Sequence, residues 1–548
     1  MSRSDYIIVG GGTCGCVLAA RLTEDPSCRV LMIEAGPRRE SPWVRVPAGF
    51  TKLLVSDRHN WHLATEPEEG TLGRTIAVPK GKGLGGSTLI NGMIMVRGQP
   101  RDYDNWSDLG AKGWSWRDLL PYFQRIEAYG GSDRTGLRGR HGPVPVAKVL
   151  DRPEIADAFI RAGCEAGYPF NDDYNGAEQA GFGWYQVNQK SGRRVSAADA
   201  YLKPALSRPN LEIVTDAMVE RIILRDGRAI GVSFRRGADV EERFCDGEVI
   251  LSAGAVHSPQ ILELSGIGDP EILARQGVAT SVALPGVGAN YIDHFCTRMN
   301  WRVSRPVTLN EQTRSWRLVA AVAQYALLRR GILTYATGLA HGFLAAHPGA
   351  THPDTQLFFM HASYADAAER KLDRQPGMTV GVSQMRPTSR GTIHIKAPDV
   401  TTMPAIRPNF LATEYDRICM VEGMKQTRRL METTPMDAFR DAELTPGPDV
   451  ESDAEWLDFA RRDGQTIYHA SGTCRMGGDD MAVVDPRLRL RGVDGLRVVD
   501  ASVMPDIISG NIQNAVFVIA EKAADMIRED RKSAAQSQTI QKEAATHV

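Results

Sequence analysis

A glycine-rich turn near the N-terminus restricts the fold more than any other feature of this sequence. Residues 5–9 form a short apolar run. Gly10, Gly12 and Gly15 follow in the spacing G-x-G-x-x-G, and residues 17–24 then carry apolar side chains at helical spacing. Glycines in this spacing let the backbone turn sharply and approach a ligand, while the helix N-terminus favours bound phosphate. The pattern predicts a strand, a turn and a helix that bind a nucleotide diphosphate.

An acidic residue ends the next predicted strand. The run at 29–33 is apolar after Arg29, and Glu34 follows it at the distance from Gly15 that suits a carboxylate bound to ribose hydroxyls. This strand completes a βαβ unit. An acid at this position favours a free 2′-hydroxyl over a 2′-phosphate, but the motif alone does not distinguish FAD from NAD.

Length and composition limit the remaining possibilities. A chain of 548 residues exceeds what one hydrophobic core usually serves, so two domains are expected. With 65 Lys+Arg against 66 Asp+Glu the net charge is -1, which provides no overall field to attract nucleic acid or an anionic membrane. The eight cysteines lack the spacing of a disulfide scaffold or a zinc site, so no metal is expected. The apolar runs are too short for a signal peptide or a membrane span, which predicts a cytoplasmic protein with no membrane-spanning segment.

Further patterns outline the rest of the fold. Strands are predicted at 211–215, 219–224, 232–234, 249–251, 356–360, 379–383 and 496–499, and helices at 314–330 and 515–528. The segment from about 300 to 465 has longer, polar-interrupted runs, and nucleotide-domain character returns after it. The first domain is therefore expected to be discontinuous in sequence.

A second glycine cluster lies at residues 79–92. Five glycines in twelve positions indicate main chain pressed against a ligand rather than side-chain packing. A flexible surface loop is the simpler alternative, but Leu84, Leu89 and Ile90 are poorly suited to one.

Residues 81–91 resemble the first signature of the glucose-methanol-choline (GMC) oxidoreductases. Further blocks that resemble family sequence lie at 254–268, 287–294, 386–391, 468–477 and 499–505. They occur in the family's order and span nearly the whole chain. Such a set is far more specific than any single glycine motif.

The resemblance implies a mixed α/β fold, α+β overall. It consists of a Rossmann-like FAD-binding domain and a substrate domain with a large antiparallel sheet and flanking helices. The FAD-binding domain is expected in residues 1–155, 205–299 and 466–530, the substrate-binding domain in 156–204 and 300–465, and a flexible tail in 531–548.

The resemblance also assigns residues to the cofactor. Contacts with FAD are expected at Gly10, Gly12, Gly15, Glu34, Gly86, Asn91, Val219, Asp500 and Ala501. Val219 would meet the adenine ring through its backbone, and Asp500 and Ala501 would lie near the ribityl and pyrophosphate groups. Ile90 stands where some members carry a histidine bonded covalently to FAD, so non-covalent FAD is expected.

His469 is the predicted catalytic base. It matches the family's catalytic histidine, and a neutral imidazole accepts a proton near pH 7 while hydride leaves the alcohol carbon for the flavin. Flavin reduction is expected to speed up with pH through a group that titrates near neutrality. The family's second catalytic position falls at Gln513 without gaps, or at Asn514 if the register slips by one, and either amide would hold the substrate oxygen. His294 is expected to make a structural hydrogen bond.

Three classes of function stay open. The leading one is an FAD-dependent oxidoreductase that converts a primary alcohol, aromatic ones included, to the aldehyde, with oxygen or an electron-carrying partner as oxidant. The second is a non-redox FAD-containing lyase on the same fold. The third, a non-catalytic flavin module, would need neither a buried base nor a large substrate domain. The sequence indicates no oligomeric state.

Overall fold

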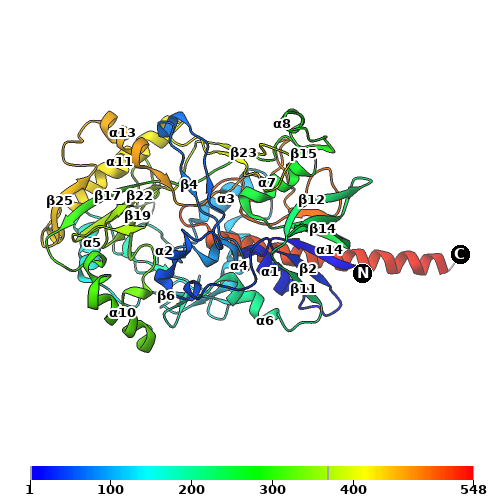
Figure 1. The fold of residues 1–548 in the computed structure, drawn as a ribbon, viewed down its shortest axis with the longest axis horizontal. Coiled ribbons are helices and arrows are strands. Elements are labelled where there is room, and N and C mark those ends of the chain that lie inside the picture. The colour runs from blue at the N-terminus through cyan, green and yellow to red at the C-terminus, as the bar shows by residue number, and fades with distance from the viewer. Residues whose placement is uncertain (1–2, 367–369, 547–548) are drawn as a thin grey trace.

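Two seven-stranded sheets in different halves of the molecule organise the part of the chain that is described (Figure 1). The computed structural model describes residues 3–366 and 370–546. The first sheet has the strand order β11-β2-β1-β14-β13-β12, with β27 beside β14. The second has the order β25-β17-β22-β19-β18-β7, with β26 beside β17.

Parallel strands form the centre of the first sheet. β1 (Ser4–Val9) lies between β2 (Val30–Ile33) and β14 (Asp239–Leu251), and the next strands outward are β11 (Leu211–Val214) and β27 (Leu496–Val498). All of β2 and the last three residues of β14 are buried. Unbroken apolar runs in these strands reflect a sheet that is covered on both faces.

Helices cover this sheet and bring distant parts of the chain together. α1 (Thr13–Leu22) follows β1 through the glycine turn and packs against α14 (Gln513–Thr546). Arg21 of α1 forms a 2.9 Å ion pair with Glu521 of α14, whose side chain is fully buried. α7 (Gly254–Leu264) begins just after β14 ends. The βαβ unit predicted from the glycine turn is confirmed.

The second sheet is antiparallel throughout its paired strands. Its strands are β7 (Gly181–Trp184), β17 (Phe295–Val303), β18 (Ala340–Leu344), β19 (Thr355–Met360), β22 (Gly377–Gln384), β25 (Arg440–Thr445) and β26 (Gln465–Thr466). α11 (Glu414–Met431) packs against β22, and α5 (Glu154–Glu165) packs against β7 and β18. The predicted antiparallel sheet with flanking helices is confirmed, and with it the mixed α/β fold class.

Shorter elements complete the fold. The remaining helices are α2 (Phe50–Leu53), α3 (Pro100–Asp108), α4 (Trp116–Ile126), α6 (Lys203–Ala205), α8 (Pro270–Arg275), α9 (Leu309–Gln312), α10 (Ser315–Leu328), α12 (Thr434–Asp437) and α13 (Asp453–Asp463). The remaining strands are β3 (Leu63–Ala64), β4 (Ala77–Val78), β5 (Glu127–Tyr129), β6 (Val144–Lys148), β8 (Gln186–Val187), β9 (Gln189–Lys190), β10 (Arg193–Arg194), β12 (Met218–Arg225), β13 (Arg228–Arg236), β15 (Ile267–Gly268), β16 (Val282–Ala283), β20 (Tyr364–Asp366), β21 (Lys371–Leu372), β23 (Thr392–His394) and β24 (Ala405–Arg407).

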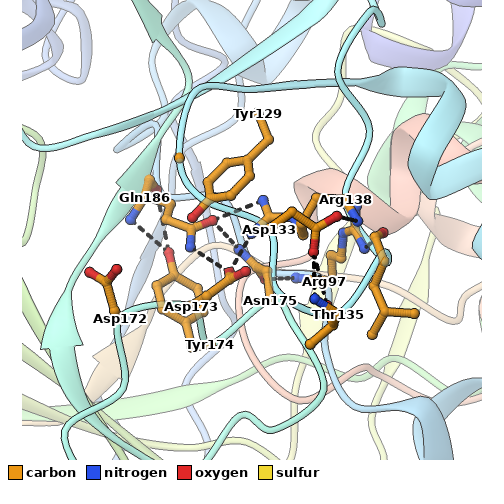
Figure 2. Close-up of polar contacts among 12 residues, drawn as sticks. Arg97, Tyr129, Asp133, Thr135, Arg138, Asp172, Asp173, Tyr174, Asn175 and Gln186 are labelled. Carbon is orange, nitrogen blue, oxygen red and sulfur yellow. Dashed lines mark hydrogen bonds and ion pairs between the residues drawn. The ribbon is translucent and has the colours of Figure 1, made fainter.

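A buried ionic network fastens loops of the N-terminal third to one another (Figure 2). Glu127 accepts hydrogen bonds from Arg97 at 2.6 Å and from Arg138 at 2.5 and 3.0 Å. Arg138 also pairs with Asp173 and donates to Gln186 at 3.0 Å. Breaking one buried pair would leave an uncompensated charge, so this network holds its segments in one arrangement.

α14 continues into the C-terminal segment. Residues 531–546, most of the segment 531–548 that was predicted as a flexible tail, are helical. None of the helices within the described residues is long and apolar enough to span a membrane.

Candidate active site

One elongated cavity extends from the glycine turn after β1 to the face of the second sheet. Of the residues predicted for the site, those that line the cavity are Gly10, Gly12, Glu34, Gly86, Asn91, Val219, His469, Asp500, Ala501 and Gln513. Gly15 and Asn514 do not line it. The structure therefore brings the predicted cofactor residues and the predicted base to one continuous space.

The glycines of the first turn serve two different purposes. A Cβ at Gly10 would lie 2.5 Å from the carbonyl oxygen of Ser252, and one at Gly15 would lie 1.9 Å from that of Gly10. These two glycines are needed for close packing of β1, α1 and the end of β14. A Cβ at Gly12 would meet no protein atom nearer than 3.9 Å, so this glycine opens toward the cavity and lets a ligand approach the backbone.

The second glycine cluster packs directly on the first. Gly85 donates its backbone N–H to the carbonyl oxygen of Gly11 at 2.7 Å. A Cβ at Gly86, whose φ is +53°, would lie 2.8 Å from the Cα of Gly12. A side chain at Gly86 would therefore separate the two loops.

Glu34 has a structural role that the sequence did not indicate. Its carboxylate accepts backbone N–H groups from Gly11 at 2.7 Å, Gly36 at 2.7 Å and Gly83 at 3.1 Å. It thus ties the two glycine clusters to the end of β2. A carboxylate has about four acceptor sites, so one site is left for a ribose hydroxyl.

Asp500 anchors the turn after β27. It is buried, and it accepts hydrogen bonds from the Gly254 N–H at 2.9 Å, the Ser258 hydroxyl at 2.6 Å and the Ser502 N–H at 2.8 Å. Burial raises the pKa of this carboxyl group. Gly254 has a φ of +85°, and a Cβ there would find no protein atom within 4 Å. Asp500 therefore fixes the backbone of Gly254, which, like that of Gly12, is open to the cavity.

These features fit a flavin dinucleotide. Gly12 and Gly254 expose main chain to the cavity, the N-terminus of α1 faces it, and Glu34 keeps one acceptor for a hydroxyl. Neutral backbone donors at a helix N-terminus suit a diphosphate, and a carboxylate suits a ribose. Ile90 also lines this space, and its hydrocarbon side chain has no nucleophilic atom.

His469 lies at the other end of the cavity and is held from three sides. Its backbone N–H donates to Asp293 at 2.8 Å. Its ring Nδ1 lies 2.9 Å from Nδ1 of His294, and its Nε2 lies 3.3 Å from the amide nitrogen of Asn511. Asp293 also accepts the hydroxyl groups of Tyr291 at 3.0 Å and Thr466 at 2.5 Å, so it fixes the turn that carries His469.

The hydrogen-bond chain decides which ring nitrogen of His469 carries a proton. His294 Nε2 lies 3.0 Å from the carbonyl oxygen of Met385, which only accepts, so Nε2 must be the protonated nitrogen of a neutral His294. Nδ1 of His294 is then an acceptor, and His469 must donate to it through its own Nδ1–H. The Nε2 of a neutral His469 is therefore unprotonated, and its lone pair accepts a hydrogen bond from the amide nitrogen of Asn511 at 3.3 Å.

Burial keeps both imidazoles neutral. The pKa of His469 is lowered well below its ordinary value by burial, and further by Lys80. Burial also lowers the pKa of His294 to about 4. The sequence predicted that the base titrates near neutrality. In the structure His469 is already neutral at that pH, and it becomes protonated, and so inactive as a base, only at a lower pH.

Asn511, which the sequence reasoning missed, occupies the position expected of Gln513 or Asn514. Its amide oxygen accepts from Gln356 at 3.1 Å, which turns the amide nitrogen toward His469. Gln513 instead donates to the hydroxyl of Thr13 at 3.2 Å in the glycine turn. Asn514 is buried, and its amide nitrogen has no partner among the described residues. α14 begins at Gln513, so the residue that reaches His469 comes from the loop before the helix.

Comparison with known proteins places this architecture in one enzyme family. Residues 4–296 and 387–520 match the N- and C-terminal sequence profiles described as GMC oxidoreductase, and the chain belongs to this family. It is an FAD-containing oxidoreductase that acts on CH–OH donors, as the sequence analysis predicted.

Several relatives resemble the chain over its length. The human mitochondrial choline dehydrogenase is 40% identical over 537 residues, which cover 95% of this chain and 89% of that protein. An alcohol dehydrogenase [acceptor] of Pseudomonas putida is 38% identical and covers 95% of each chain. The crystal structure of pyridoxine 4-oxidase from Mesorbium loti superposes with a TM-score of 0.87 at 33% identity, over 96% of this chain and 99% of that one.

Proposed function

We propose that this protein oxidises a primary alcohol to the aldehyde, with Nε2 of His469 as the base that accepts the hydroxyl proton. FAD supplies the hydride acceptor when it is bound. The observation that supports this most strongly is the position of the Asn511 amide nitrogen, 3.3 Å from His469 Nε2. The amide nitrogen donates hydrogen bonds, and the unprotonated Nε2 accepts them.

A hydroxyl group matches this pair of atoms. The hydroxyl would replace the hydrogen bond between the two side chains: it donates its proton to the lone pair of His469 Nε2, and its oxygen accepts from the amide of Asn511. Asn511 thus holds the substrate oxygen while its proton passes to His469. The C–H bond of the alcohol carbon then faces the cavity. Asn511 takes the place that the sequence gave to Gln513 or Asn514.

The protein also stabilises the imidazolium that forms. His469 keeps its Nδ1–H bond to His294 after Nε2 is protonated, so the ring orientation does not change. Because the site is buried, this bond to the charged ring is stronger than its counterpart in water.

Further details stay proposals. We propose non-covalent FAD because Ile90 offers no atom for a covalent bond. We also propose a cytoplasmic location and either oxygen or an electron-carrying partner as oxidant. For the compartment, the support is that seven of the eight cysteines are buried as free thiols, Cys164 alone being exposed.

Stopped-flow measurement of flavin bleaching by an alcohol without oxygen tests the proposal. General-base catalysis contributes about 10²- to 10⁴-fold, so His469→Ala should slow bleaching at least about a hundredfold while FAD stays bound. Asn511→Ala removes one neutral hydrogen bond and should slow it up to about tenfold.

Gln513→Ala serves as the matched control, because its amide bonds Thr13 rather than His469. It should slow bleaching less than Asn511→Ala. A flavin-loaded His469→Ala protein that bleaches at the wild-type rate would refute the assignment of the base. Failure of every alcohol to bleach the flavin would favour a non-redox lyase.

A further inference from the structure

The end of the cavity that adjoins His469 is positively charged. Arg298 and Arg370 both line it. Arg370 donates to the hydroxyl of Tyr468 at 2.8 Å. The carboxylates among the described lining residues are Glu34 and Asp500, and both belong to the cofactor end, where backbone and hydroxyl donors occupy them.

The register of the second sheet places Arg298 close to the reacting groups. Cys296 on β17 aligns with Ser383 on β22 and, across it, with Gln356 on β19, whose amide bonds Asn511. Arg298 stands two residues further along the same face of β17. Two residues of strand span about 7 Å, so Arg298 lies one side-chain row beyond the row that contacts the catalytic amide.

The row of Arg298 is shaped to admit a ligand. Arg298 aligns with Gly381 on β22, and Gly381 aligns with Phe358 on β19. Because Gly381 has no side chain, the sheet surface between Arg298 and Phe358 carries no side-chain atoms that would fill this space. A Cβ at Gly381 would come only to 3.4 Å from Cys296 Sγ and 3.5 Å from Phe358, ordinary contact distances.

No residue that the structure describes pairs with the guanidinium of Arg298. Its side chain is half-buried, and its guanidinium makes no hydrogen bond or ion pair with any residue that the structure describes. The buried arginines Arg97 and Arg138, by contrast, pair with Glu127. A half-buried guanidinium that lines a cavity suits a planar anion, which it binds through two parallel hydrogen bonds.

We infer that the alcohol substrate carries an anionic group, a carboxylate, separated from the carbinol by a flat apolar spacer. This inference rests on the proposed function and names the substrate class of the same site. His469 and Asn511 hold the hydroxyl, Phe358 and Met360 contact the spacer, and Arg298 binds the carboxylate one side-chain row further along the sheet. Alcohols that carry a fixed positive charge are disfavoured, because that charge would face two guanidinium groups.

Three alcohols with different charges test this in the FAD-loaded enzyme: 4-(hydroxymethyl)benzoate, benzyl alcohol and choline. Anaerobic bleaching should be most efficient with the benzoate, by about 10- to 100-fold over benzyl alcohol, the range for a hydrogen bond to a charged group. Choline should be the poorest of the three. Arg298→Gln should abolish the preference for the benzoate, and Arg298→Lys should keep part of it. Arg275→Gln is the control, since Arg275 pairs only with Glu271 on the surface, and it should leave the preference unchanged.

A binding measurement separates this inference from the proposed function. The probe 4-methylbenzoate has no hydroxyl group, so its binding, followed by the flavin difference spectrum, does not depend on turnover. It should bind about 10- to 100-fold more weakly to Arg298→Gln than to the wild type. Equal binding to both proteins, or a preference for benzyl alcohol or choline, would overturn the inference and leave the proposed function intact. Arg298-dependent binding without bleaching by any alcohol would refute the proposed function alone.

Discussion

Replacing His294 tests whether the hydrogen-bond chain sets the tautomer of His469. In the wild type, His469 donates through Nδ1–H to His294, and this leaves Nε2 free to act as the base. In His294→Leu that acceptor is gone. A neutral hydrogen bond contributes about 0.5–1.5 kcal/mol, so the base-competent tautomer should fall about 2- to 13-fold relative to the other one. Flavin reduction follows the fraction of His469 in the base-competent tautomer, so it should slow by at most this factor, far less than in His469→Ala.

The same substitution should also shift the pH profile. Burial lowers the pKa of His294 to about 4, so it is neutral near pH 7, and as the acceptor of the Nδ1–H it stabilises the charged form of His469. Without that acceptor the pKa of His469 should fall further. Since only the neutral ring accepts a proton, reduction should slow as the pH falls through this pKa. The decline should therefore begin at a lower pH in His294→Leu than in the wild type.

Anaerobic stopped-flow bleaching, followed from neutral pH down to the lowest pH at which FAD stays bound, measures both effects in one experiment, because the pKa of His469 lies well below its ordinary value. His294→Asn is the matched control, because its amide oxygen can accept from Nδ1 of His469 and should restore part of the rate. If His294→Leu and His294→Asn were equally slow and their pH profiles matched the wild type, the tautomer argument would be wrong.

Two further predictions concern the cofactor. Acid precipitation should release yellow FAD into the supernatant, because Ile90 offers no covalent attachment; colour that stays in the pellet would contradict this. Glu34→Gln should weaken FAD binding by about tenfold or more, since the carboxylate holds three backbone N–H groups and a neutral amide oxygen accepts them less strongly. Fluorescence of released FAD on dilution measures this, and an unchanged dissociation constant would show that the two glycine clusters keep their arrangement without the charge.

Local patterns were sufficient for much of the fold. The predicted strand at 5–9 and the helix that follows it are β1 and α1, because apolar runs bounded by glycine leave few alternatives. The predicted strands at 356–360 and 379–383 are the cores of β19 and β22. The helix predicted at 314–330 is α10.

The site was less accessible to the same reasoning. His294 and Asn511 contact His469 across 175 and 42 residues of sequence, and no local pattern reports such contacts. The choice between Gln513 and Asn514 assumed an alignment through the start of α14, whose first residue was not known. The hydrogen bonds of Glu34 form only where the two glycine loops pack together. The position of Arg298 follows from the register of β17 with β22.

The cofactor site draws on parts of the chain that are made at very different times during synthesis. The turn after β1 leaves the ribosome long before β27, Asp500 and the start of α14 do. At about 5–20 residues per second, roughly 25–100 s pass between them. The sheet around β1 has no β27 during this interval, and Gly254 has no Asp500 to hold it. Flavin capture therefore belongs to the finished chain, and a nascent chain that stops short of Asp500 has no complete place for the diphosphate.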